Sequence, residues 1–138
     1  MSMHEQWITG FTDGEGCFHI GISKNNETKL GSQVLLEFVI TQHQRDEQLL
    51  NEIKNYFGVG VVRKSNGRGD ILCYRVRSQK HLRDVILPFF EKNILRTKKK
   101  FAFQRFKQAL VLIENKEHLT LEGLDKLRKL RDQVDDSD

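Results

Sequence analysis

Apolar and polar residues alternate along two stretches in the first third of the chain, 18–23 and 33–41. In both stretches every second residue is apolar, which is the period of a strand that buries one face and exposes the other. Residues 25–29 between them are polar and are typical of a hairpin loop. Leu35 and Val39 lie on the outer face of the second strand. We therefore predict a hairpin whose outer face is only partly polar.

A second hairpin is predicted in the middle of the chain, with strands at 59–64 and 71–77. The residues between the strands, 65–70, contain an Asn-Gly step and a second glycine, which are typical of tight turns. The outer face of the later strand would carry Arg75 and Arg77. The pattern thus indicates an antiparallel pair with guanidinium groups on its exposed side.

Other stretches carry apolar residues at intervals of three and four, the period of an amphipathic helix. Gly58 would end the second of these helices. Pro88 and the loop at Asn93 would close the third. The predicted helices cover 4–15, 45–57, 81–90 and 98–113, and a last helix is capped by Thr120 and buries Leu121, Leu124, Leu127 and Leu130.

The order of these elements predicts an α+β fold of pattern αββαββα, followed by one or two further helices. A four-stranded antiparallel sheet would carry helices on one face and leave the other face open as a saddle. With 138 residues, 38% of them hydrophobic, the chain is expected to form a single domain over 1–138. Its acidic tail is expected to fray from about residue 135.

The first helix ends in an unusual run of glycines. Gly10 and Gly14 share one helix face, and each costs about 1 kcal/mol relative to alanine in a helix interior. Close approach of another backbone would offset this cost, so we expect a partner helix. Gly16 would end the helix and leave Glu15 in the last turn, where the helix dipole disfavours a carboxylate unless a cation lies beside it.

Charge is unevenly distributed along the chain. Residues 114–138 hold five Lys/Arg and eight Asp/Glu, a net charge of −3. The whole chain has a net charge of +4, so residues 1–113 carry a net charge of +7. The basic body favours a polyanionic partner. Cys17 and Cys73 are too few for a disulfide framework or a zinc site, and both are expected to be reduced and buried.

Residues 8–16, ITGFTDGEG, resemble the motif that names the LAGLIDADG homing endonucleases. The stretches 38–42, 58–60 and 98–100 follow at compatible spacing, so the resemblance covers nearly the whole chain. It implies a site-specific DNA endonuclease that binds a long, near-palindromic target, hydrolyses one phosphodiester in each strand and leaves short 3′ overhangs. The matching motif positions are Gly10, Asp13, Glu15 and Gly16, with Gly14 in the small-residue position.

The chain holds one copy of the motif, so a homodimer is the simplest source of the partner helix. Two Glu15 carboxylates would then lie close together and would need divalent cations between them, for which Mg²⁺ suits hard oxygen ligands. Mn²⁺ would substitute, and Ca²⁺ would support binding without cleavage. The predicted interface residues are Gly10, Phe11, Asp13 and Gly14.

The resemblance also implies the roles of individual residues. Glu15 matches the metal-binding acid, with the Gly14 carbonyl as a second ligand. Gln42 matches a polar residue that organises water in the active site. Lys98 matches a basic residue near the cleaved phosphate, although Lys99 or Lys100 could take that role because the alignment is uncertain by one or two residues.

The open sheet face has the width and the mixture of donors and acceptors to lie in a DNA major groove, where arginine reads guanine and glutamine reads adenine. Apolar residues on the same face would contact thymine methyl groups. The predicted DNA-binding residues are His19, Ser23, Asn25, Gln33, Leu35, Glu37, Val39, Thr41, Arg63, Ser65, Arg68, Cys73, Arg75 and Arg77.

The sequence is also compatible with other functions. The family includes RNA-binding maturases that help introns splice, and the chain could also be half of a two-motif monomer or a DNA-binding module without nuclease activity. Neither a membrane-spanning apolar run nor a signal-peptide region is present in the sequence. We expect an intracellular protein without a membrane partner or small-molecule substrate, and the resemblance implies an intron of a mitochondrion or chloroplast.

Overall fold

The structure is a computed structural model that describes residues 3–65 and 68–133. The predicted fraying tail and two residues of the predicted turn, 66–67, lie outside this part. The strands are β1 (Gly16–Lys24), β2 (Ser32–His43), β3 (Val61–Ser65) and β4 (Arg68–Val76). The helices are α1 (Glu5–Glu15), α2 (Glu47–Phe57), α3 (Gln79–His81), α4 (Leu87–Lys92), α5 (Lys99–Glu114) and α6 (Leu121–Asp132), with short 3₁₀ turns at Gln44–Asp46 and Glu117–Leu119 and a π turn at Leu82–Ile86.

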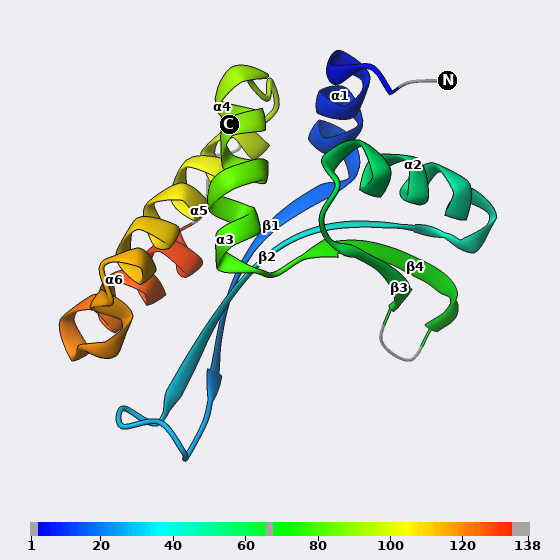
Figure 1. The fold of residues 1–138 in the computed structure, drawn as a ribbon. Helices are drawn as coiled ribbons and strands as arrows, with labels where there is room; N and C mark the ends of the chain where they lie inside the picture. Colours follow the sequence, from blue (N-terminus) through cyan, green and yellow to red (C-terminus); the bar gives the residue numbers. More distant parts are fainter. Residues whose placement is uncertain (1–2, 66–67, 134–138) are drawn as a thin grey trace.

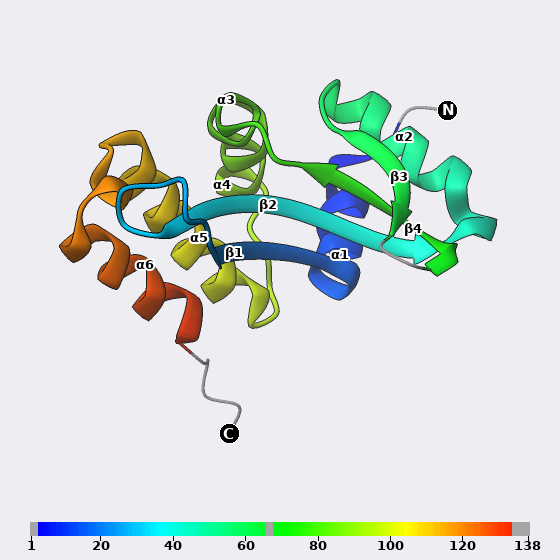
Figure 2. The same cartoon turned by 90° about the horizontal axis from the view of Figure 1, so that it is seen from below.

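The four strands form one antiparallel sheet in the order β1-β2-β4-β3. Helices lie along one face of this sheet, and the opposite face is open (Figure 1). Figure 2, seen from below, shows the strands in front of the helices. The period of two in the sequence therefore separates a face toward the helices from a face toward solvent, as predicted.

The core lies between the sheet and the helices. The Phe18 ring lies 5.1 Å from Phe38, 5.5 Å from Phe90, 5.2 Å from Phe103 and 5.4 Å from Phe106, measured between ring centroids. These rings come from both strands of the first hairpin and from α4 and α5. Each large buried side chain stabilises the fold by about 1.5–3 kcal/mol, so this cluster fixes the helices onto β1 and β2.

The prediction that Pro88 closes a helix is wrong. Helical backbone continues from Gln79 to Lys92, and Pro88 lies inside it. Proline lacks an N–H, and its ring clashes with the carbonyl four residues earlier in a regular α-helix. A π turn precedes it, in which the Leu87 N–H bonds to the Leu82 carbonyl, and this wider turn accommodates the ring.

The last helix begins as predicted, because the Thr120 Oγ1 accepts a hydrogen bond from the Gly123 N–H at 3.0 Å. Leu121, however, was expected to be buried and is 73% exposed. The turn Glu117–Leu119 packs against the start of α6 so closely that a Cβ on Gly123 would lie 1.8 Å from the Glu117 oxygen. This contact fixes the first turn of the helix and leaves Leu121 on its outer side.

No helix in the described part of the chain is both long and apolar enough to cross a membrane.

Candidate functional site

Glu15 lies where α1 passes directly into β1. A Cβ on Gly16 would lie 2.7 Å from Cγ2 and 3.0 Å from the carbonyl oxygen of Thr12, so only glycine allows the strand to begin here. Glu15 is exposed, and among residues 3–65 and 68–133 it has no hydrogen-bond or ion-pair partner. The carboxylate is therefore uncompensated at the negative end of a helix, which the sequence predicted as a feature that calls for a cation.

Asp13 makes contacts within the chain that the sequence analysis did not anticipate. Its Oδ2 accepts from the Arg96 N–H at 2.9 Å, and its Oδ1 accepts from the Thr97 N–H at 3.1 Å and from the Thr97 hydroxyl at 2.8 Å. Burial raises the pKa of Asp13, but these hydrogen bonds and the charge of Lys99 outweigh that effect and hold the pKa below its usual value. Its place at a helix interface stays a prediction.

Lys99 is a basic residue that contacts the α1–β1 junction. Its ammonium group donates to the carbonyl oxygen of Gly16, the residue after Glu15. Lys98 is exposed and lies just before the first residue of α5. The sequence pointed to Lys98 with an uncertainty of one or two residues, and the start of α5 decides which ammonium group turns toward the α1–β1 junction.

Gln42 lies near the same junction, on the helix-covered side of β2. It is half-buried and shares a strand face with Ile40, which is paired with Gly16. Two residues along a strand span about 6.6 Å, so Gln42 lies a short distance past the start of β1. Its predicted role at the site stays a prediction.

One face of α1 is not covered by the described chain. Gly10 and Gly14 are exposed, and a Cβ on either would meet nothing within 4 Å. Trp7 is 45% exposed and stacks on Phe11, with ring centroids 5.0 Å apart. A hollow of about 520 Å³ beside Gly10 is lined by residues of α1 and of the segment at 92–96. The bare glycine face thus has room for the backbone of another helix, as expected.

Register brings most of the predicted DNA-binding residues onto the open face. His19 faces Glu37, Ser23 faces Gln33, Val39 faces Arg75, and Thr41 and Arg63 both face Cys73. Leu35 is half-buried on the same face. Ser65 lies at the end of β3, while the side chain of Arg68 lies outside the described part of the structure.

Polar contacts organise part of this face. The Arg77 Nε donates to the Glu37 Oε2 at 2.6 Å, and Glu37 is only 16% exposed. Because the carboxylate engages Nε, the two terminal nitrogens of Arg77 keep their donors for another acceptor. The Asn25 Nδ2 donates to the Gln33 Oε1 at 2.8 Å across the end of the first hairpin.

The expectation for Cys17 is wrong. Both cysteines are free, and Cys73 is buried, but Cys17 is exposed. Cys17 lies opposite Val39 on the open sheet face. Its odd position in the alternating strand, two residues before His19, is the sequence signal that could have placed it there.

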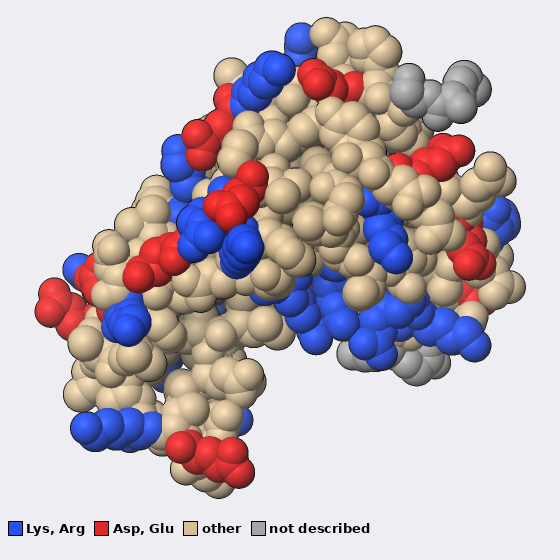
Figure 3. All heavy atoms as spheres, in the orientation of Figure 1, with Lys and Arg blue, Asp and Glu red and all other residues tan. Residues whose placement is uncertain are grey.

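Basic side chains follow the open face. In Figure 3, Lys and Arg atoms gather along the lower side of the molecule beneath β3 and β4. The residues on the open side of these strands include Arg63, which is exposed, and Arg75, which is half-buried. The arrangement is suited to a polyanion lying along the sheet.

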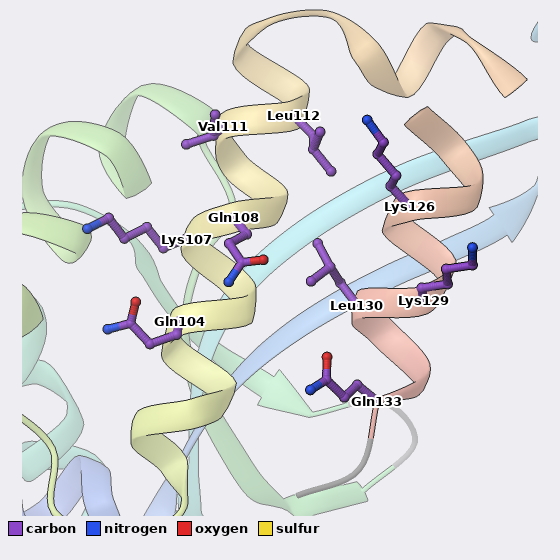
Figure 4. Close-up of a pocket in the computed structure, with 9 residues that line it drawn as sticks. All are labelled: Gln104, Lys107, Gln108, Val111, Leu112, Lys126, Lys129, Leu130 and Gln133. Atoms are coloured by element: carbon purple, nitrogen blue, oxygen red, sulfur yellow. The ribbon is translucent and has the colours of Figure 1, made fainter. Parts of the chain in front are cut away.

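A separate groove of about 500 Å³ runs between α5 and α6 (Figure 4). Val111, Leu112 and Leu130 lie in it, and Lys126 and Lys129 stand along its α6 side. None of the predicted site residues lines this groove. The features that the sequence singled out therefore converge on the α1–β1 junction and the sheet, not on this groove.

Metal ligands are sparse within the chain. No group of three His, Cys, Asp or Glu side chains that could hold a metal ion occurs in the described ranges. A site at Glu15 would therefore need ligands from outside the chain.

An αββαββα fold with an open basic sheet face and an uncompensated acid at the end of a glycine-lined helix suits a protein that binds a polyanion. Residues 8–110 match the sequence profile of the LAGLIDADG endonuclease family. The chain belongs to this family, which includes the homing endonucleases.

Curated relatives are intron-encoded. The chain is 44% identical over 123 residues to an uncharacterized 50.9 kDa protein in ND4 intron 1 of Podospora anserina, covering 87% of the chain and 27% of the relative. It is 38% identical over 130 residues to probable intron-encoded endonuclease 2 of Neurospora crassa, covering 94% and 28%. The chain thus spans about a quarter of the length of these relatives.

Solved structures confirm the predicted fold. The homing endonuclease I-TnaI is 42% identical, with a TM-score of 0.91, and the match covers 100% of this chain and 92% of that one. I-SmaMI bound to an uncleaved DNA target in the presence of calcium ions is 36% identical, with a TM-score of 0.92, and the match covers 97% of this chain but 45% of that one.

Proposed function

We propose that the protein is a site-specific DNA endonuclease that hydrolyses one phosphodiester in each strand of a long, near-palindromic target and leaves short 3′ overhangs. The observation that carries the proposal is Glu15, an exposed carboxylate without a partner in the described chain, at the junction of a glycine-lined helix and a basic sheet face. Membership of the LAGLIDADG endonuclease family and the DNA-bound state of I-SmaMI support this reading.

A divalent cation, Mg²⁺ with Mn²⁺ as a substitute, fits the donors at this junction. Glu15 offers a carboxylate, and the exposed Gly14 offers a backbone carbonyl, both hard oxygen ligands. Mg²⁺ retains several waters and commonly shares phosphate oxygens, so the remaining ligands would come from DNA, water and a second domain. When bound, the ion would polarise a phosphate oxygen and lower the pKa of an attacking water.

The other proposed catalytic residues belong to the chain itself. The Gln42 amide can orient a water by donating and accepting hydrogen bonds. An ammonium group can offset charge on the phosphate in the transition state. We assign that role to Lys99 or Lys98, and the contact between Lys99 and the Gly16 carbonyl favours Lys99.

DNA binding is assigned to the open sheet face. Arg63, Arg75 and Arg77 supply guanidinium groups suited to phosphates or guanine, and Gln33 and Thr41 supply neutral donors and acceptors. Leu35 and Val39 suit thymine methyl groups. A four-stranded face with these groups on one side supports recognition of many base pairs.

We further propose that two such domains act together, as a homodimer. The empty space over Gly10 and Gly14 supports a partner helix, and I-TnaI is a chain of nearly the same length. The runner-up is one half of a two-motif monomer, which the 45% coverage of I-SmaMI favours. Light scattering of the chain separates the two, because a stable monomer would contradict the homodimer.

The relatives in introns also support an origin in an organellar intron. A maturase that binds intron RNA is a further reading from the resemblance, and the uncompensated Glu15 favours cleavage over it.

A cleavage selection tests the function. The purified chain is incubated with a randomised, palindromic double-stranded DNA library and Mg²⁺, and cut molecules are sequenced. We expect one family of sites with 3′ overhangs, cut with Mg²⁺ or Mn²⁺ and bound but left intact with Ca²⁺. A chain that binds DNA and cuts none of the library with either metal would refute the proposal.

A further inference from the structure

We infer that Asp13 is a positioning residue that holds the start of α5 and so places the Lys99 ammonium group at the α1–β1 junction. The inference rests on the proposed nuclease function, because it concerns how that site is assembled. Asp13 reaches neither substrate nor metal in this role and acts only through the residues that it holds.

Asp13 joins two parts of the chain that are 83–84 residues apart. Asp13, in the last turn of α1, accepts both backbone N–H groups of Arg96 and Thr97 and also the Thr97 hydroxyl. One carboxylate thereby engages three donors of the segment that leads into α5. Hydrogen bonds to an ionised acceptor are stronger than neutral ones, so this contact holds the segment firmly, in addition to the burial of Leu95 in the core.

Thr97 connects this attachment to the first turn of α5. Lys98, the residue before the helix, makes no side-chain cap. Instead the Thr97 Oγ1, which donates to Asp13, accepts the Lys99 N–H at 3.2 Å. The Asp13 charge also lies at the positive end of this 16-residue helix, where an anion is favourable.

The side chain of Lys99 is held as well. Lys99 Nζ contacts the carbonyl of Gly16, next to Glu15. Both ends of Lys99 are thus fixed to the α1–β1 junction, its backbone through Thr97 and Asp13 and its side chain through Gly16. Releasing the backbone end would let α5 start elsewhere and move the ammonium group away from the Gly16 carbonyl.

The test compares Asp13→Asn with wild type in two measurements. Amide hydrogen exchange should speed up at least about tenfold at Arg96, Thr97 and Lys99 in the variant and stay unchanged in β1 and β2, because asparagine keeps one acceptor and turns a donor toward the other N–H. On a target from the cleavage selection, the single-turnover rate with Mg²⁺ should fall roughly 10- to 100-fold. DNA affinity measured with Ca²⁺ should change less than about twofold, because the sheet face is intact.

A pair of variants at Thr97 checks the relay. Thr97→Val keeps the shape and removes the hydroxyl, so it should slow cleavage by several-fold, and Thr97→Ser should recover most of the rate.

An Asp13→Asn cleavage rate that stays at the wild-type value while the three amides exchange faster would overturn the inference and leave the nuclease proposal standing. Equal losses of affinity, rate and melting temperature would also overturn it, since that pattern describes general unfolding. Wild-type protein that binds its target without cutting would instead refute the nuclease function, and the positioning role with it.

Discussion

At the residue scale, the motif predicted where the two acids lie but not which residues Asp13 contacts. Glu15 is exposed and lacks a partner in the described chain, as its place at the end of α1 indicated. The contacts of Asp13 could not be predicted, because Arg96 and Thr97 lie far along the chain and offer main-chain donors, which leave no trace in residue type. The choice between Lys98 and Lys99 likewise depends on the residue at which α5 begins, and sequence patterns fix helix ends only to within a few residues.

Glu15→Gln should abolish cleavage and leave specific DNA binding within about threefold of wild type. The amide keeps the shape and loses the charge that a divalent cation requires, while the proposed DNA contacts lie on the sheet. A filter-binding assay with Ca²⁺ and a cleavage assay with Mg²⁺ on the same target measure the two effects. Loss of binding together with cleavage would contradict this separation.

Asp13 should make folding stability depend on acid pH. Its pKa in the folded protein lies below the unfolded value of about 3.9, so its contribution is present above that pH and is lost as the pH falls through the folded pKa. Urea unfolding of wild type and Asp13→Asn should therefore show the variant less stable at pH 7 and the gap much smaller at pH 3. A gap of equal size at both values would show that the charge of Asp13 contributes nothing.

At the element scale, strands were easier to predict than helix ends. Alternation in 18–23 and 33–41 placed β1 and β2 correctly, since a strand that buries one face must repeat every two residues. The path past Pro88 was not predictable from local rules, because tertiary packing maintains helical backbone through a π turn that proline alone does not specify. Leu121 was misplaced for a similar reason, since the turn before α6 sets which side of its first turn faces inward.

Two glycines in helices should respond oppositely to a larger side chain. Gly10→Leu meets nothing within the chain, so the folded subunit should persist with its melting temperature little changed, while association is lost. Gly123→Leu is the matched control, because its Cβ would overlap the Glu117 carbonyl; unfolding free energy should drop by at least about 1–3 kcal/mol.

Light scattering and thermal melts together read out both changes. A Gly10→Leu protein that stays dimeric would remove the argument for a helix partner at this face.

At the scale of the whole molecule, the layered arrangement and the open face followed from the sequence, because element order and strand period leave few alternatives. The groove between α5 and α6 did not, since it depends on surfaces contributed by both helices (Figure 4). The basic body was visible as +7 on residues 1–113, but its concentration beneath β3 and β4 became visible only with the fold (Figure 3).

DNA affinity should fall steeply with salt concentration. The change in the slope of log K against log salt on replacing single basic residues should show which face binds DNA. Replacing Arg63 by Gln should reduce the slope of log K against log salt by about 0.9 if it neutralises one phosphate. Lys129→Gln, in the groove between α5 and α6, removes the same charge away from the sheet and should leave the slope unchanged. Equal effects of the two replacements would indicate that binding follows net charge alone.

The attachment of Asp13 to Arg96 and Thr97 also limits when the proposed site can form during synthesis of the chain. The ribosome releases α1, which carries Asp13, more than eighty residues before it has made Arg96 and Thr97, the partners of Asp13. A nascent chain therefore carries the α1–β1 junction early but lacks the contact between Lys99 and the Gly16 carbonyl until α5 has formed. A chain interrupted before residue 96 would therefore hold Asp13 without the partners that join α1 to the start of α5.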